Sequence, residues 1–176
     1  MRYSNDFGII LKKNQLLGDN ILVTLFSLSK GKVVLKAYGV KKLNSKRMAH
    51  LETGNYISFS SYQKGAHTTL TETELVYGYS KIRKSSEKLA YLFTYLFVLN
   101  RILPEDQPDG AMFTNTKAFL KELNNKTEFV TKDLIKHFDQ LLFTAGFLSP
   151  EKQNGAGYDT MLFVEEVIGR KVDVMF

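Results

Sequence analysis

Residues 21–38 hold two β-rich runs, Ile21-Leu22-Val23-Thr24-Leu25-Phe26 and Val33-Val34-Leu35-Lys36-Ala37-Tyr38, on either side of the turn Ser29-Lys30-Gly31-Lys32. Apolar and β-branched runs that flank a glycine-containing turn predict a β-hairpin. A turn-forming sequence, Gly18-Asp19-Asn20, separates the first run from an earlier apolar run, Phe7-Gly8-Ile9-Ile10-Leu11. The beginning of the chain therefore predicts three consecutive strands.

A polar segment from Gly39 to His50 precedes a second pair of strand-like runs, Tyr56–Tyr62 and Thr68–Tyr77, which Gln63-Lys64-Gly65-Ala66 joins. The first of these runs alternates, which predicts one wet face and one buried face. The wet face would carry Tyr56, Ser58, Ser60 and Tyr62, and the buried face Ile57 and Phe59. Five strands with an irregular insert after the third predict a small closed barrel of the OB type. An SH3-like barrel or a plain five-stranded meander fits the same pattern.

The hydrophobic period changes to that of helices at Ser85, which is placed to cap a helix that Pro104 ends. A second helix is expected from Asp109-Gly110 to Asn124-Asn125, and a third from a Thr131 cap to Gly146. Residues 152–157 predict a flexible link to a last helix around Met161–Ile168. The expected fold class is α+β, with a five-stranded OB-fold barrel in residues 1–80 and an all-helical domain in residues 81–176, interrupted by a short linker near 151–158.

Charge divides along the same line. Residues 1–84 carry 14 basic and 5 acidic side chains, a formal charge of +9, whereas residues 85–176 carry 10 basic and 13 acidic ones, a charge of −3. A basic module joined to a mildly acidic body is typical of a polyanion-binding protein. The longest apolar run, Leu89–Leu99, is too short for a membrane span, and Asp6 with Lys12-Lys13 argues against a signal peptide. We expect a cytoplasmic, nucleoid-associated protein.

Candidate catalytic and metal-binding groups are sparse. The chain has no cysteine and three scattered histidines, so neither a thiolate nor a histidine metal site is expected, and no cofactor is predicted. Phosphate loops, nucleophile elbows and H-E-x-x-H motifs are absent from the sequence. Glu72 and Glu74 are read as a solvated strand face, and His137 as a surface residue on a helix. Glu105, Asp106 and Asp109 are read as turn and capping residues. The sequence therefore does not predict an enzyme.

One basic strip is the most informative feature. It has seven basic side chains and no acidic one within 18 residues, namely Lys30, Lys32, Lys36, Lys41, Lys42, Lys46 and Arg47. Such a concentration of like charge repels itself unless a polyanion relieves it through counterion release. Tyr38 is interleaved with the strip, and Tyr56 and Tyr62 share the polar face of the next strand, where aromatic rings can stack on bases. We expect these seven cations and Tyr38 to bind nucleic acid, and the family resemblance given next implies that it is DNA.

The chain also resembles the RecO family of bacterial DNA repair proteins. The resemblance rests on an ordered set of short motifs that covers most of the chain, and the sequence departs from the family pattern at Asp19, Ser27, Tyr38 and Lys41. The motifs are Gly8-Ile9-Ile10-Leu11-Lys12, Gly18-Asp19-Asn20, Leu25-Phe26-Ser27, Lys30-Gly31-Lys32-Val33, Ala37–Ser45, Leu51, Leu141-Leu142, Gly146-Phe147-Leu148-Ser149-Pro150 and Ile168-Gly169-Arg170-Lys171.

The resemblance implies an N-terminal OB barrel, a helical domain and no catalysis. It implies binding of single- and double-stranded DNA, annealing of complementary strands, and, with RecR, loading of RecA onto DNA covered by single-stranded DNA-binding protein in recombinational repair. By analogy, Lys132 and Lys136 would help receive the acidic tail of that protein. Many family members carry a four-cysteine zinc insert after the Gly146–Pro150 segment, which this cysteine-free chain lacks, so any function that relies on the missing surface is in question. A different class, an RNA-binding or assembly adaptor built on an OB fold and without annealing activity, fits the residues as well.

Overall fold

The computed structural model describes residues 2–42, 45–65, 67–149, 151 and 158–172. The chain forms two compact units. The barrel unit comprises Met1–Gly78 together with Pro104–Asp109, and the helical unit comprises Tyr79–Leu103 with Gly110–Phe176. The barrel unit is therefore built from two separate pieces of sequence.

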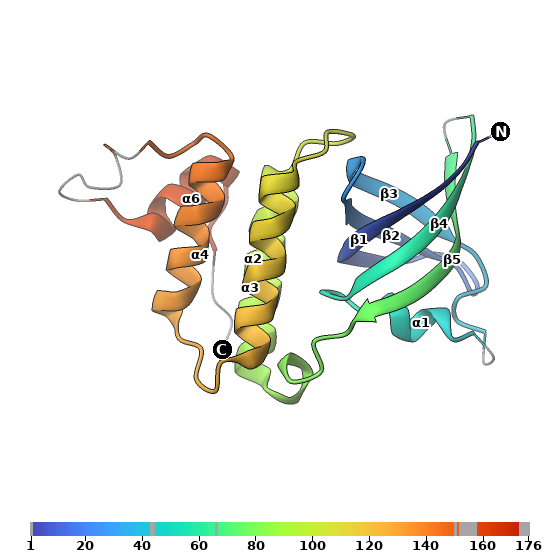
Figure 1. Cartoon of the computed structure of the whole chain (residues 1–176), viewed down its shortest axis with the longest axis horizontal. Helices are drawn as coiled ribbons and strands as arrows, with labels where there is room; N and C mark the ends of the chain where they lie inside the picture. The colour runs from blue at the N-terminus through green and yellow to red at the C-terminus, as the bar shows by residue number, and fades with distance from the viewer. Residues whose placement is uncertain (1, 43–44, 66, 150, 152–157, 173–176) are drawn as a thin grey trace. The chain divides into compact units, whose positions relative to one another are not determined.

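The barrel consists of five strands, β1 (Arg2–Gln15), β2 (Ile21–Ser27), β3 (Gly31–Ala37), β4 (Tyr56–Lys64) and β5 (His67–Tyr77), closed in the order β1-β2-β3-β5-β4 (Figure 1). Neighbouring strands are antiparallel except β3 and β5, which run parallel at the register pair Lys36 and Thr69. A meander would pair only consecutive strands in antiparallel fashion, so this parallel contact rules it out. The predicted OB-type barrel followed by helices is confirmed.

The barrel core is formed by the alternate side chains that point inward. β3 shows the pattern most simply, because Val33, Leu35 and Ala37 are buried while the residues between them reach the surface. The insert after β3 contributes the short helix α1 (Arg47–His50) and two further core residues, Val40 and Leu51, both fully buried. The polar segment between β3 and β4 thus supplies apolar side chains to the core.

β1 is longer than the apolar run Phe7–Leu11 predicts. Its first half pairs with β4 from Arg2 to Ile9, and its second half pairs with β2 from Gly8 to Gln15, with an irregularity between Ile10 and Lys12. The polar ends of the strand carry no hydrophobic signal, because only the middle of the strand is buried on both sides. Pairing with β4 and β2 therefore sets the length of β1, and hydrophobic periodicity alone does not reveal it.

The helical unit contains the 3₁₀ turn η1 (Ile82–Lys84) and the helices α2 (Ser86–Ile102), α3 (Gly110–Asn125), α4 (Thr131–Thr144) and α6 (Thr160–Ile168) (Figure 1). Ser85 caps α2, because its hydroxyl accepts a hydrogen bond from the Lys88 N–H at 3.2 Å. The Tyr95 ring of α2 stacks on Phe119 with centroids 3.8 Å apart and on Phe138 at 5.9 Å, which joins α2, α3 and α4. Among the described helices, none is long and apolar enough to span a membrane.

Two helix ends differ in how well the sequence predicts them. The Thr131 cap is wrong: Thr131 is the first helical residue, Val130 precedes it, and the Asp133 carboxylate accepts the Val130 N–H at 3.0 Å. Gly146 does end α4 in the left-handed conformation, with φ of 77°. The predicted flexible link at Lys152–Gly157 lies outside the described residues.

His137 is not the surface residue that its polar sequence neighbours predict. Its side chain is only 11% exposed, and its Nε2 lies 3.1 Å from a carboxylate oxygen of Glu122. The ring packs edge-on against Phe119 and face-on against Phe129. Burial lowers the pKa of His137 below its ordinary value, although the neighbouring Glu122 carboxylate opposes that effect.

Candidate nucleic-acid interface

The outward face of β3 carries the first part of the basic strip. Lys32 and Lys36 alternate with buried residues, so both project from the same side of the strand, with Val34 exposed between them. Lys36 stands opposite Leu22 on β2 and opposite Thr69 on β5. It therefore lies where β3 and β5 meet and the barrel closes.

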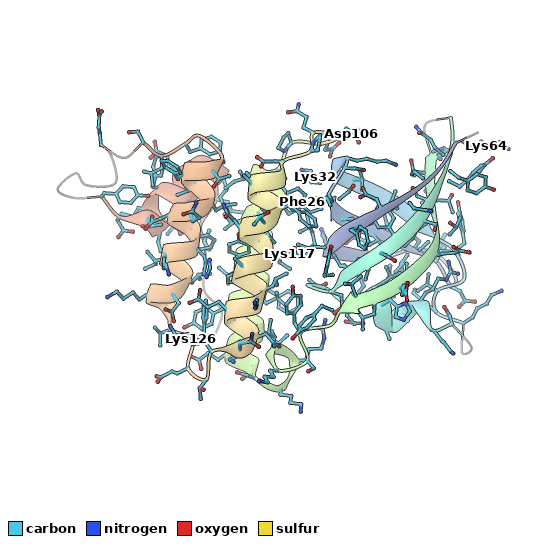
Figure 2. The ribbon with its side chains drawn as sticks, in the orientation of Figure 1. Phe26, Lys32, Lys64, Asp106, Lys117 and Lys126 are labelled. Atoms are coloured by element: carbon cyan, nitrogen blue, oxygen red, sulfur yellow. The ribbon has the colours of Figure 1, made fainter. Side chains whose placement is uncertain are left out.

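Acidic residues from far along the sequence lie beside this face. The loop Pro104–Asp109 packs in the barrel unit, where the Asp106 N–H donates to the Lys32 carbonyl at 3.1 Å. The backbones of Glu105 and Lys32 pair in an isolated parallel β-bridge. Figure 2 labels Lys32 and Asp106, which the hydrogen bond joins. The strip that is free of acids in sequence is thus flanked by acids in space at its Lys30–Lys32 end.

A polar cavity of about 610 Å³ opens at the same end. Lys30 and Lys32 line it together with Glu105 and Asp106. The Lys30 ammonium donates to the Ser4 hydroxyl at 2.7 Å, and Ser4 is in turn 2.9 Å from the buried Ser61 hydroxyl. Lys30 is therefore held against the barrel by an uncharged partner.

The end of β3 is fixed by Arg47, which lies at the start of α1. One guanidinium nitrogen donates to the Tyr38 carbonyl at 2.6 Å, and the other donates to the Thr71 carbonyl on β5 at 3.2 Å. Two backbone carbonyls occupy these donors, so Arg47 ties the end of β3 to β5 while adding charge to the surface. The Tyr38 side chain itself is half exposed.

The remaining lysines follow β3 in the insert. The Lys41 ammonium lies 3.2 Å from the Gln15 side-chain oxygen and 3.3 Å from the Gly18 carbonyl, and its backbone N–H donates to the Asp19 carbonyl. Lys42 and Lys46 are exposed. Lys41 thus continues the positive surface from β3 toward the loop between β1 and β2, and Lys42 and Lys46 add exposed charge within the insert.

A row of outward residues extends from Lys36 across the other strands. Lys36 is the register partner of Thr69, Thr69 of Tyr62, and Tyr62 of Tyr3. The rings of Tyr62 and Tyr3 are in contact, with centroids 4.9 Å apart. Sequence reasoning missed Tyr3, because the position lies before the apolar run of β1 and only strand pairing brings it to Tyr62.

The wet face predicted for β4 is confirmed. Tyr56 and Tyr62 lie at its two ends, and Ser58 and Ser60 lie between them. Tyr56 contacts Phe7 at a centroid distance of 6.0 Å, and burial together with the nearby Asp6 carboxylate raises the Tyr56 pKa. Between the two aromatic pairs, Ser60 and Ser58 stand opposite Glu72 and Glu74, and the Ser60 hydroxyl donates to Glu72 at 3.2 Å. Tyr62 is therefore separated from Lys36 only by Thr69, whereas Tyr56 lies beyond two exposed glutamates.

The two lysines expected to bind a protein tail lie on the exposed side of α4. Lys132 and Lys136 border a hollow of about 550 Å³ with Ile135 and Phe143, and Asp133, Asp139 and Gln140 complete its lining. The hollow combines cationic and apolar groups with two acids.

The described residues hold no group of three or more histidine or acidic side chains placed to bind a metal ion. The sequence has no cysteine, so these 176 residues do not supply a four-thiolate zinc site.

Comparison with known proteins identifies relatives of this chain. Residues 1–79 match the family model described as Recombination protein O N terminal. A protein named DNA repair protein RecO from Acetivibrio thermocellus is 25% identical over 170 residues, 93% of this chain and 66% of the relative. A protein of the same name from Bacillus subtilis is 30% identical over 121 residues, 69% of this chain and 48% of the relative. Another from Exiguobacterium is 29% identical over 137 residues, 76% of this chain and 53% of the relative. The chain thus spans about half to just under two thirds of the length of these relatives.

Proposed function

Because the chain belongs to the RecO family, we propose that it is a DNA-binding mediator of recombinational repair rather than an enzyme. In this role it binds single- and double-stranded DNA and anneals complementary strands. Together with RecR it helps load RecA onto DNA that single-stranded DNA-binding protein covers. The relatives' name supports the repair role.

The observation that carries the DNA contact is the position of the basic strip. Lys32 and Lys36 share the outward face of β3, and Lys41, Lys42 and Lys46 continue from its end. Residues 1–84, which include the barrel strands, have a formal charge of +9. When these lysines bind phosphates, they displace the cations condensed on the DNA, and the release of these counterions favours binding strongly at low salt.

Positive charge at the surface also supports the binding of a protein partner. The hollow beside Lys132 and Lys136 on α4 offers ammonium groups next to Ile135 and the exposed Phe143. An acidic peptide with an aromatic end suits such a surface, as the tail of single-stranded DNA-binding protein would. The acids Asp133 and Asp139 in the same lining limit how much negative charge the hollow accepts.

The test removes Lys41, Lys42 and Lys46 together by substitution with glutamine. Arg47 is kept, because its guanidinium holds the Tyr38 and Thr71 carbonyls and its loss would disturb the barrel itself. Binding of a fluorescent single strand, followed by anisotropy at several salt concentrations, should weaken. The slope of log affinity against log salt should become shallower by about 2, since each lost phosphate contact removes roughly 0.7.

A matched control replaces three exposed lysines outside the barrel strands, Lys84, Lys121 and Lys171, by glutamine. It removes the same charge and should change the slope far less. An unchanged slope and affinity in the Lys41/Lys42/Lys46 variant would contradict this DNA site.

Annealing is measured separately with two complementary labelled oligonucleotides, bare or coated with single-stranded DNA-binding protein. Competition by RNA of the same sequence distinguishes the adaptor alternative, because a reader of RNA would prefer the strand with 2′-hydroxyls. If the chain binds RNA more tightly than DNA and does not anneal complementary strands, the RNA-binding adaptor replaces the repair mediator as the proposed function.

A further inference from the structure

The surface of the barrel carries one continuous row of four outward residues, each the register partner of the next: Lys36 on β3, Thr69 on β5, Tyr62 on β4 and Tyr3 on β1. Neighbouring strands are ~4.8 Å apart, so the row crosses the strands over roughly 15 Å. Its two ends differ in chemistry, with an ammonium group at Lys36 and two aromatic rings at Tyr62 and Tyr3.

The aromatic end is open to solvent. The Tyr3 side chain is 74% exposed, and its ring leans on Tyr62 at an interplanar angle of 43°. A tyrosine ring presents a flat apolar face on which any unpaired base can stack, and such rings are the usual platforms in proteins that bind single strands. Lys36 supplies the cation for a phosphate at the other end of the row.

Acidic side chains bound the row on both sides along the strands. Toward the end of β5, the exposed Glu72 and Glu74 stand opposite Ser60 and Ser58. In the opposite direction along β3, Glu105 and Asp106 lie beside Lys32. Since carboxylates repel phosphates, the row between them is the path of least repulsion for a polyanion that leaves the basic strip.

We propose that an unpaired DNA strand crosses the barrel along this row, with a phosphate at Lys36 and bases stacked on Tyr62 and Tyr3. The proposal rests on the DNA binding proposed above and adds the course of the strand. It also predicts that the two tyrosine rings make the chain prefer single strands to duplexes. A duplex can reach the lysines, but its base faces are already stacked on one another, so Tyr62 and Tyr3 favour single strands over duplexes.

The first experiment compares Tyr3→Ser and Tyr62→Leu with Phe7→Ser. Phe7 belongs to the other aromatic pair, is 43% exposed, and lies in the groove with Glu74, so it is the matched control. Affinities are measured for a labelled single strand and for a duplex of equal length. Each tyrosine variant should lose about fivefold or more for the single strand, with duplex affinity unchanged, and Phe7→Ser should leave both unchanged.

The second experiment uses the absence of tryptophan from the sequence. Tyr3→Trp gives the chain a single tryptophan, placed in the row, and stacking of a base on the indole should quench the tryptophan emission when a single strand binds. An oligonucleotide of abasic sites should bind through its phosphates without quenching. Phe143→Trp, on the half-exposed face of α4 in the helical unit, should not respond to either strand.

The outcomes separate this inference from the proposed function. If the unmodified chain binds no DNA by anisotropy, the proposed function fails. If it binds DNA but single-strand affinity is equal in the tyrosine variants, or Tyr3→Trp is not quenched, the course of the strand is overturned while the basic strip stands. Equal losses for single strand and duplex would overturn the role of the rings in discrimination.

Discussion

Gly31 occupies the first position of β3 with a φ of 75°, a conformation that residues with a side chain rarely adopt. A Cβ placed on it would lie 2.0 Å from the Gln107 carbonyl oxygen, which is a backbone atom that cannot rotate away. Glycine here permits both the turn into β3 and the approach of the Pro104–Asp109 loop.

Gly31→Ala should therefore destabilise the barrel by about 2 kcal/mol or more, because backbone strain adds to displacement of the loop. The control is Gly18→Ala: Gly18 also has a positive φ, 66°, but no atom lies within 4 Å of its added Cβ. That variant should lose only about 1 kcal/mol of strain. Urea unfolding measures both, and equal losses would show that the loop contact contributes nothing.

A second prediction concerns His137 and the pH dependence of folding stability. Because burial lowers its pKa from the ordinary value of 6.5, the unfolded chain takes up a proton at His137 more readily than the folded one. Stability should therefore be complete above the ordinary value and fall as the pH is lowered through it.

The measurement is the urea midpoint between pH 7.5 and pH 5.5, values on either side of the ordinary histidine pKa. His137→Gln should flatten this dependence even though loss of the packed ring lowers stability at every pH. His67→Gln, at an exposed position, should keep the slope of the unmodified chain. A slope that survives in His137→Gln would assign the dependence to other groups.

At the scale of elements, the loop Pro104–Asp109 places Glu105 and Asp106 beside β3, where they line the same cavity as Lys30 and Lys32. These carboxylates reduce the positive potential at one end of the basic strip. Sequence distance hides the effect, since more than 70 residues separate Lys32 from Glu105.

Glu105→Gln with Asp106→Asn should strengthen DNA binding severalfold at low salt and steepen its salt dependence, because phosphates would then reach Lys30 and Lys32. The Asp106 N–H contact to Lys32 uses the backbone and survives these substitutions. Anisotropy titrations measure the change, with Glu128→Gln and Glu166→Gln on exposed positions of the helical unit as the charge-matched control. Weaker or unchanged binding would mean that DNA does not approach this end.

The sequence predicts the barrel well because each inward position repeats at the strand period. Ile57 and Phe59 on β4 alternate with polar residues and are buried as the pattern indicates. The Ser85 cap and the Gly146 terminator are likewise local signals with local causes. The true start of β1 and the Val130 cap escape prediction because pairing partners and a neighbouring carboxylate set them, not periodicity.

For the candidate site, charge density in the sequence indicates the basic strip, but not how its members differ. Only the structure distinguishes Arg47, whose guanidinium holds two carbonyls, from the exposed Lys42 and Lys46. Likewise, Tyr62 and Tyr56 are equivalent by period. Cross-strand register separates them, because it sets Tyr62 in line with Lys36 and Tyr56 beyond Glu74.

At the scale of the whole molecule, the two units have the same formal charge but offer different surfaces. The barrel unit, with the acids of Pro104–Asp109 included, has 11 basic and 8 acidic side chains, and the helical unit has 13 basic and 10 acidic ones. The barrel unit concentrates its basic side chains in the strip from Lys30 to Arg47, whereas the helical unit bears the hollow at Lys132 and Lys136. In the proposed function, the barrel unit holds the nucleic acid and the helical unit contacts proteins.

The discontinuous make-up of the barrel unit affects how the chain can be divided for study. A fragment that stops near residue 80 keeps all five strands yet lacks Pro104–Asp109, which leaves the Lys32 carbonyl without its Asp106 donor and Gly31 without its close neighbour. Such a fragment would carry an uncovered strand edge next to a glycine, the kind of surface that invites pairing between copies. Fragments made to study the barrel should therefore retain the chain through Asp109, and substitutions in that short loop should be interpreted as barrel mutations.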